Sequence, residues 1–286
     1  MLLHLRISII FLLVFFGLNQ AKAQEVPERI RVTTNHVNLG LSSISMLDNY
    51  ISDLKYEGAG LRLSNVSRKR LDTEKGVWVV VSDQLIEVGN TLNSPQTASM
   101  FYSNFNFGYG AQKGIKVSDD FRLFVGGTFD FQYVSHQTDR NVNNYFNMNM
   151  CTNLNAAFTG VLDAEIWKTD VQFFYDVRIP LVGLSFLPDL GISYYEMYQN
   201  NEFSSYVYVT SLHNKQMIQR HFWVQIPLKK VFLNLGMQFE SNLLQIKRNH
   251  FRSKIVSLTA GLSYHFSLFG GRNRNKLSMI TEAENW

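Results

Sequence analysis

The sequence predicts an all-β protein, a single antiparallel up-and-down transmembrane β-barrel of about ten strands, with eight or twelve strands as alternatives. Three observations predict this fold. The chain begins with the pattern of an export signal, long stretches alternate apolar and polar residues, and short turns alternate with long polar connections. The composition agrees, because the 22 Phe and 13 Tyr residues favour strands and only 5 Pro residues interrupt them.

The first 23 residues have the pattern of a cleaved secretory signal. A short basic stretch precedes an apolar run over residues 9–18, and Ala21-Lys22-Ala23 then provides an Ala-x-Ala cleavage site. The apolar run is about half the length that a membrane-spanning helix needs, so an uncleaved anchor is the less favoured alternative. No Cys follows the site, which argues against a lipoprotein anchor. We expect cleavage after Ala23.

The chain therefore divides into three expected parts: a cleaved signal (1–23), an outer-membrane β-barrel (24–268) and a periplasmic C-terminal tail (269–286). Cleavage removes two basic residues and no acidic ones, so the formal charge falls by two, from +4 to +2. A nearly neutral exported chain without a polybasic patch is not expected to bind nucleic acid. Cys151 is the only cysteine, which excludes an internal disulfide.

Four alternating stretches come first in the chain. The alternation is weak at 32–45, 56–67 and 77–88, and it is clear at 101–110, where Phe and Tyr share one face and Asn and Gly the other. Residues 121–133 form the clearest run, because every second residue is apolar or Gly and the positions between them are polar except for Phe124. Such a run suits a tilted membrane strand of about nine to eleven residues with extensions.

The second half of the chain repeats this alternation, with apolar residues on one face and Asn, Gln, Ser, Thr, Asp or His on the other. The runs cover residues 154–166, 171–179, 221–226, 231–240 and 256–266. Ten strands in all return both ends of a barrel to the same side of the membrane.

The connections between these runs also alternate in length. Lys168-Thr169 and Lys229-Lys230 read as tight turns, whereas residues 135–150, 185–204 and 241–253 read as long polar loops. Long loops on one side and short turns on the other are typical of outer-membrane barrels. We therefore expect the cell outer membrane as the location, with outer-membrane lipid and the export and barrel-assembly machinery as partners.

Four short stretches resemble a known family. Residues 40–52 (GLSSISMLDNYIS), 89–94 (GNTLNS), 193–196 (SYYE) and 211–214 (SLHN) are similar to an uncharacterised Gram-negative family, domain of unknown function 3316. The likeness extends over residues 37–266. The resemblance implies a β-rich exported protein and assigns no activity.

The polar faces of the strands are expected to line the lumen. A barrel of ten strands is narrow enough for side chains to fill, and buried charges of opposite sign usually satisfy one another. We expect structural pairing across the lumen, with a proton or solute pathway as the alternative. The residues expected to form this network are Asp130, Asp163, Asp176, Arg178, His221, Gln225, Gln238, Glu240 and His265.

Ser211 and His213 are weak catalytic candidates. Two residues apart on a strand, they would share a face, as a nucleophile and its base must. Asn214 would point to the opposite face unless a bulge intervenes, and no third group that orients His213 can be named. A barrel-embedded lipid hydrolase or deacylase is therefore an alternative function, and the sequence weighs against enzyme activity without deciding it.

Tyr194, Tyr195 and Glu196 lie in the expected loop 185–204 and are candidates for binding, because adjacent tyrosines offer rigid aromatic surface. An interfacial aromatic girdle or a loop folded into the lumen are alternatives. The histidines show no metal motif, and no cofactor is expected. The ligand cannot be named.

A soluble periplasmic β-protein is the alternative for location, since strands of soluble sheets also alternate. Its strands should be shorter and its polar faces more charged. The sequence thus predicts an integral outer-membrane barrel with a structural or interaction role, or with passage of small solutes.

Overall fold

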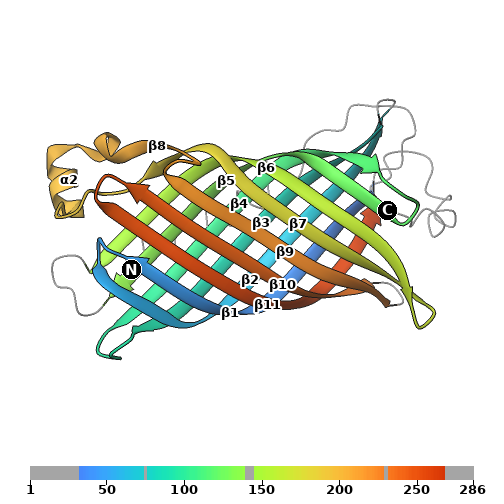
Figure 1. The fold of residues 1–286 in the computed structure, drawn as a ribbon, viewed down its shortest axis with the longest axis horizontal. Helices are drawn as coiled ribbons and strands as arrows, with labels where there is room; N and C mark the ends of the chain where they lie inside the picture. The colour runs from blue at the N-terminus through green and yellow to red at the C-terminus, as the bar shows by residue number, and fades with distance from the viewer. Residues whose placement is uncertain (1–31, 74–75, 139–144, 229–230, 268–286) are drawn as a thin grey trace. The chain divides into compact units, whose positions relative to one another are not determined.

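Ten long antiparallel strands close into one barrel in the computed structural model, which describes residues 32–73, 76–138, 145–228 and 231–267 (Figure 1). Neighbours in the chain pair in order, and β1 pairs with β11 to close the barrel. The short strand β8 (Val207–Ser211) only extends the sheet beside the end of β7. The barrel strands are β1 (Val32–Asp48), β2 (Ser52–Thr73), β3 (Gly76–Asn93), β4 (Ser99–Lys116), β5 (Phe121–Thr138), β6 (Phe146–Ile166), β7 (Thr169–Phe186), β9 (Lys215–Leu228), β10 (Val231–Ile246) and β11 (Asn249–Ser267).

The prediction of a ten-stranded antiparallel barrel is confirmed, and each alternating run of the sequence lies within one of these strands. The expected signal, its cleavage site and the expected C-terminal tail lie outside the described residues. Among the described residues, no helix has the length and apolar character needed to cross a membrane.

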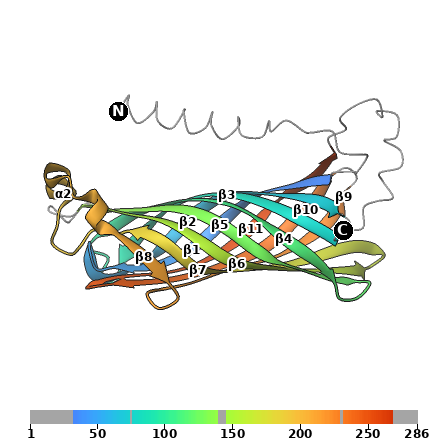
Figure 2. The same cartoon turned by 90° about the horizontal axis from the view of Figure 1, so that it is seen from above.

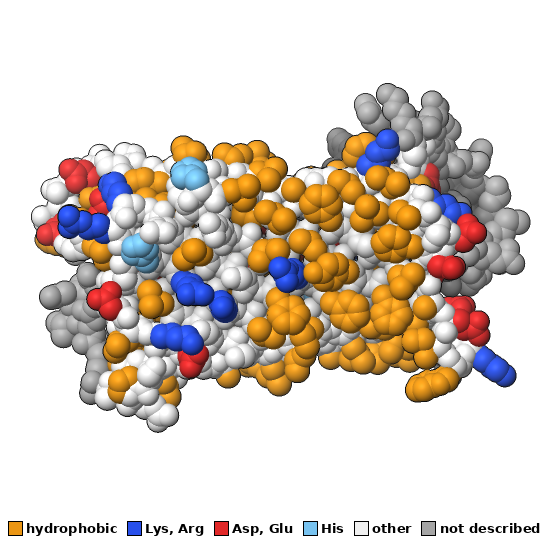
Figure 3. All heavy atoms as spheres, in the orientation of Figure 1, with side chains coloured by type: hydrophobic (Ala, Val, Ile, Leu, Met, Phe, Trp, Pro, Cys, Tyr) orange, Lys and Arg blue, Asp and Glu red, His pale blue; other side chains and the backbone are white. Residues whose placement is uncertain are grey.

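The alternation places apolar side chains outside and polar side chains inside. On β11, Leu258 and Leu262 are exposed, while Ser257 and Ser263 are fully buried in the interior. Figure 3 shows apolar side chains gathered over one half of the barrel, the half in which β1 begins and β11 ends, with charged side chains mostly towards the two ends of the barrel. We call the end where β1 begins and β11 ends the terminal end, and the opposite end the loop end. A soluble barrel has the opposite arrangement, because its apolar side chains fill the core.

Tight turns join the strands at the terminal end. Between β6 and β7, Ile166 pairs with Thr169, and the intervening Trp167 and Lys168 have φ of +49° and +65°. Positive φ at both central residues is the geometry of a type I′ hairpin turn. The expected turn therefore falls one residue earlier than Lys168-Thr169. Residues 229–230 lie outside the described chain, but Leu228 and Val231 pair on either side of them.

Of the long loops expected at the loop end, one is wrong and a second is shorter than expected. Residues 241–253 form paired strands, because β10 and β11 continue to Ile246 and Asn249 and leave only a two-residue turn. In the expected loop 135–150, residues 135–138 belong to β5 and 146–150 to β6, while 139–144 lie outside the described residues. The alternation fades there, while the backbone hydrogen bonds of a hairpin continue whatever the side chains are. Loss of the pattern therefore marks a change of surroundings and not the end of a strand.

The third long connection, 185–204, carries helical structure at the loop end (Figure 2). Helix α2 (Tyr194–Asn200) begins at Ser193, whose side chain accepts a hydrogen bond from the Glu196 backbone N–H while the Glu196 carboxylate accepts from the Ser193 N–H. This reciprocal pair is a capping box. The helix ends at Asn201 in the left-handed conformation, and the 3₁₀ turn η1 (Phe203–Tyr206) leads into β8.

Candidate functional site: the filled lumen

Apolar side chains gather inside the barrel near the terminal end. Phe174 and Trp223 stack with ring centroids 4.7 Å apart and planes only 5° from parallel. They come from neighbouring strands, β7 and β9, and pack against inward residues of β3, β5 and β6. We call this group the apolar layer: Val79, Val81, Phe124, Val161, Phe174 and Trp223. Phe124, the exception to alternation on its strand, is inward because this layer needs a large apolar side chain.

A first ionic network lies next to the apolar layer, on the side of the loop end, and crosses the lumen. Arg178 on β7 donates to Asp83 on β3 at 2.7 Å, and Asp130 on β5 lies 4.0 Å from the same guanidinium. Asp176 on β7 accepts from Arg68 on β2 at 3.2 Å. β2 and β7 are separated by four strands in either direction around the barrel, so this ion pair joins opposite walls. The Arg68 guanidinium also lies 5.3 Å from the Trp223 ring centroid, which links the network to the apolar layer.

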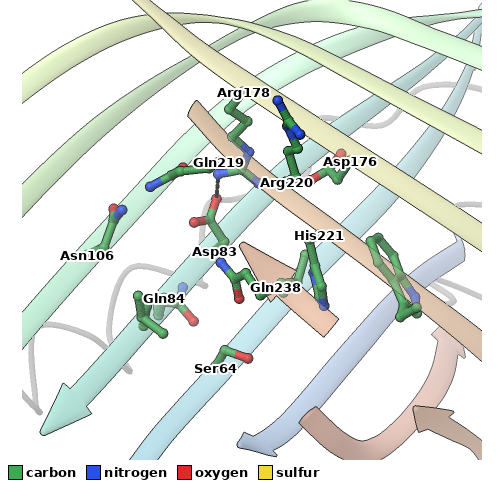
Figure 4. A pocket seen from close by; sticks show the side chains of 13 residues that line it. Ser64, Asp83, Gln84, Asn106, Asp176, Arg178, Gln219, Arg220, His221 and Gln238 are labelled. Carbon is green, nitrogen blue, oxygen red and sulfur yellow. Dashed lines mark hydrogen bonds and ion pairs between the residues drawn. The ribbon is translucent and has the colours of Figure 1, made fainter. Parts of the chain in front are cut away.

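A small cavity of about 50 Å³ remains inside this network (Figure 4). Figure 4 shows the residues around it, which include Asp83 on β3, Asp176 and Arg178 on β7, and His221 on β9. The volume is enough for one or two water molecules. It offers no room for an organic solute.

A second ionic network lies closer to the loop end. Arg62 on β2 forms a two-pronged contact with Glu87 on β3, in which Nε and Nη2 donate to Oε1 and Oε2, both at 3.1 Å. The Arg62 Nη2 atom also lies 3.8 Å from Glu240 on β10. Gln132 donates to Glu240 from β5 at 3.4 Å, and Ser42 donates to Glu87 at 2.5 Å. The Arg62 and Glu87 side chains have no exposed surface, so this is a buried, hydrogen-bonded charge cluster.

A second group of buried apolar residues lies inside the barrel at the loop end. The cluster consists of Ile44, Met46, Tyr50, Ile51, Tyr56, Ala98, Met100, Tyr102, Val134 and Ile255, from strands β1, β2, β4, β5 and β11 and the connections beside them. A polar inner face was expected from the sequence, and at this end apolar side chains share the interior with buried polar ones. The strands project beyond the exposed apolar band, so their interior is filled like the core of a soluble protein.

A buried histidine and carboxylate hold the connection 185–204 over this cluster. Asp48 lies 2.9 Å from the His136 Nδ1 atom and accepts from Asn147 at 2.6 Å. The Tyr194 hydroxyl donates to the Asn147 side-chain oxygen at 2.8 Å and accepts from the Met148 backbone N–H at 2.7 Å. Burial raises the pKa of Tyr194 above its ordinary value, so this hydroxyl stays protonated and able to donate.

The nine residues predicted from sequence to line the lumen occupy two regions. Asp130, Asp176 and Arg178 belong to the first network and Glu240 to the second. His221 and Gln238 line the small cavity, and Gln225 is buried.

Asp163 and His265 line an open vestibule of about 1070 Å³ at the terminal end instead. Asp163 is half-buried, contacts Arg122 and accepts from Gln172 at 2.7 Å. The His265 Nδ1 atom lies 2.7 Å from the Thr34 hydroxyl. The apolar layer contributes Phe124 to the lining of this vestibule.

Sequence reasoning missed the partners that complete the networks. The alternation is weak in the runs that contain Arg62 on β2 and Asp83 and Glu87 on β3, and Arg68 lies one residue beyond the predicted run 56–67. A local signal was present, since Arg62 stands between the exposed Leu61 and Leu63. A charge flanked by two lipid-type residues on a barrel strand points inward.

The Ser211–His213 pair lies in a turn. Ser211 ends β8, and His213 belongs to the turn before β9, so the expected shared strand face is wrong. The Ser211 Oγ and His213 Nδ1 atoms are 2.5 Å apart, and Asn214 accepts from the Ser211 backbone N–H and donates to the Val209 carbonyl. Among the described residues, no hydrogen bond or ion pair joins His213 to a carboxylate. The pair fits a hydrogen-bonded turn at the surface.

The three loop candidates have separate roles. Tyr194 anchors the connection inward and Glu196 caps α2, whereas the Tyr195 side chain is exposed. Tyr198, one helical turn later, is exposed beside it. In the described part of the chain, no group of three or more His, Cys, Asp or Glu side chains is placed to hold a metal ion.

A family model described as "Protein of unknown function (DUF3316)" matches residues 7–273 of the chain. No functionally curated protein matches it. Solved structures that it resembles include the transport unit of the autotransporter AIDA-I from Escherichia coli, at 9% identity over 87% of this chain and 94% of that one, with a TM-score of 0.41.

Two other solved structures are similar at the same level. The outer membrane protease OmpT from Escherichia coli has 7% identity, with 86% of this chain and 99% of that one covered and a TM-score of 0.43. The translocator domain of the autotransporter NalP from Neisseria meningitidis has 12% identity, with 92% and 96% covered and a TM-score of 0.38. Likeness at these values does not extend to activity or ligand.

Proposed function

The chain belongs to the DUF3316 family, and from that premise we propose that it is an integral outer-membrane β-barrel with a closed lumen and a structural or interaction role. Its partners in this proposal are outer-membrane lipid along the wall and the export and barrel-assembly machinery during biogenesis. The working surface is the outer wall and the loop end.

The apolar band supports the membrane location. On β11 the outward residues from Val256 to Tyr264 are apolar, and eight residue steps of strand cover about 27 Å. With a strand tilt of about 40°, the band is about 21 Å tall along the barrel axis, close to the apolar band of known outer-membrane barrels. Exposed leucines on β1 and β2, Leu39, Leu41 and Leu61, continue the band around the barrel.

The side chains that cross the lumen carry the proposal of closure. The Arg68–Asp176 pair joins opposite walls, and the stacked Phe174 and Trp223 rings lie beside it. A hydrated ion would have to break a buried ion pair and then cross an apolar layer. Breaking a buried pair costs about 3–5 kcal/mol, which opposes passive conduction.

The loop end is the side proposed to face the cell exterior, because it carries the longest connection, between β7 and β8, and the longer loops of outer-membrane barrels are extracellular. It presents strands that extend past the apolar band, together with α2 and the exposed Tyr195 and Tyr198. Exposed tyrosines on a short, capped helix are suited to contact with a partner.

Three measurements test this proposal. The purified full chain should migrate differently on a gel before and after heating, and it should remain in the membrane pellet after carbonate extraction. In planar bilayers it should show no steady conductance, whereas the Phe174→Ala, Trp223→Ala double variant, which removes the two stacked rings of the apolar layer, should show more frequent brief openings than wild type. A carbonate-soluble protein would overturn the membrane location, and a steady wild-type conductance would overturn the closed lumen.

A further inference from the structure

Basic side chains gather around a groove on the outer wall of the barrel towards its loop end. The groove has a volume of about 260 Å³ and is lined by Ser45, Met46, Leu47, Lys55, Arg252 and Lys254. These residues come from β1, β2 and β11, which are adjacent in the sheet.

The register of these strands explains why the cations meet. Arg252 pairs with Leu47, and Lys254 pairs with Ser45, so β11 and β1 present them side by side. Phe251, Ser253 and Ile255 are buried in the interior, which leaves Arg252 and Lys254 on the outer face.

The charge of the groove is not neutralised by the protein. Lys55 forms an ion pair with Glu57, its neighbour on the same face. In the described part of the chain, neither Arg252 nor Lys254 has a hydrogen-bond or ion-pair partner. Two exposed cations therefore remain uncompensated beside a groove.

The groove lies at the edge of the apolar band that is nearer the loop end. On β11 the outward residues that follow Lys254 are Val256 and Leu258, and both are exposed. On β1 the exposed Leu41 and Leu39 occupy the same stretch. The cations lie towards the loop end and the leucines towards the terminal end. Such a surface matches a molecule that carries an anionic head and apolar chains.

We propose that this groove binds the phosphate headgroup of a membrane lipid in the leaflet nearer the loop end, with its acyl chains along Val256, Leu258 and Leu41. The inference rests on the proposed membrane location. The Arg252 guanidinium can hold a phosphate through two parallel N–H···O bonds, and Lys254 supplies a second cation. Each basic residue near an anionic lipid surface favours binding by about fivefold.

A soluble phosphate is a poorer occupant of the same groove. Its binding would use the two cations and leave the leucine wall without a role. A lipid headgroup uses both, and the bilayer holds it at high local concentration beside the groove. The charge together with the adjoining apolar wall is the reason for choosing the lipid.

Native mass spectrometry of the full chain in detergent tests the inference, with phosphatidic acid as probe and phosphatidylcholine as competitor. The double variant Arg252→Gln, Lys254→Gln should bind phosphatidic acid about 25-fold more weakly than wild type. The matched control Lys113→Gln, Lys116→Gln removes two positive charges at the terminal end and should bind like wild type. Inorganic phosphate at millimolar concentration should not displace the lipid.

Equal losses in the two double variants would overturn the inference, because binding would then follow net charge alone. Displacement by inorganic phosphate would also overturn it in favour of a free-anion site. Heat-dependent gel migration of each variant reports folding. If the variants fold and bind phosphatidic acid as wild type does, the inference fails while the proposed barrel stands. If carbonate releases the wild-type chain from membranes, the proposed function itself is rejected.

Discussion

Substitution of Arg62 is the sharpest test of the buried networks. Its guanidinium contacts Glu87 through two 3.1 Å hydrogen bonds and lies 3.8 Å from Glu240. In an Arg62→Met variant, two buried carboxylates would face each other with no cation between them. Removal of one partner of a buried ion pair costs about 3–5 kcal/mol, so we expect the free energy of unfolding to fall by that amount.

The control is Lys55→Met, which removes the cation of the exposed Lys55–Glu57 pair and should cost less than about 1 kcal/mol. Equilibrium unfolding in urea, followed by tryptophan fluorescence in detergent micelles, measures both variants. Adding Glu87→Gln to Arg62→Met should recover part of the loss, because one uncompensated charge disappears. If Arg62→Met unfolds within about 1 kcal/mol of wild type, the lumen is wet and the account of a dry, packed interior is wrong.

Three further predictions concern the loop end. Tyr194→Phe loses its hydrogen bond to the Met148 N–H, so residues 187–206 should be cleaved faster by protease while the urea midpoint of the barrel is unchanged. The Ser193 backbone and hydroxyl donate to Glu196 and hold the pKa of its carboxyl below the ordinary 4.5. This stabilisation is present above pH 4.5 and is lost as the pH falls through the lowered pKa. After correction for intrinsic exchange, hydrogen exchange of the α2 amides should therefore accelerate in acid in wild type. In Glu196→Gln the corrected exchange should not depend on pH. Wild type and Ser211→Ala should release equal, background amounts of fatty acid from phospholipid vesicles, and release that disappears in Ser211→Ala would support the hydrolase.

The sequence was informative where the surroundings differ across the barrel wall. Along β11, lipid-type residues alternate with Ser and Thr because the outward face is apolar and the inward face is polar. Beyond that band the inward residues of β10 are apolar too, since Leu244 and Ile246 are buried inside. Inward and outward residues therefore no longer differ in polarity as they do within the band. The sequence of 241–253 therefore predicts a loop, although Ile246 and Asn249 pair at the tip of a hairpin.

The partners in the ionic networks were not predictable in the same way. Alternation predicts that Asp176 points inward. It does not predict that Asp176 pairs with Arg68, which is 108 residues away along the chain. That meeting depends on the stagger of the strands around the closed barrel. The same limit applies to the cations of the outer groove, since Lys55 joins Arg252 and Lys254 only through the registers of β2, β1 and β11.

The order of layers inside the barrel connects its stability to its proposed role. The ionic networks lie between the apolar layer at one end and the apolar cluster under α2 at the other. Exclusion of water from both sides strengthens the attraction between the buried charges and raises the cost of separating them. The proposal of a lumen closed to solutes rests on this filling. Contact with other molecules is then confined to the lipid-facing wall and to the loop end, where the basic groove and the exposed tyrosines of α2 are found.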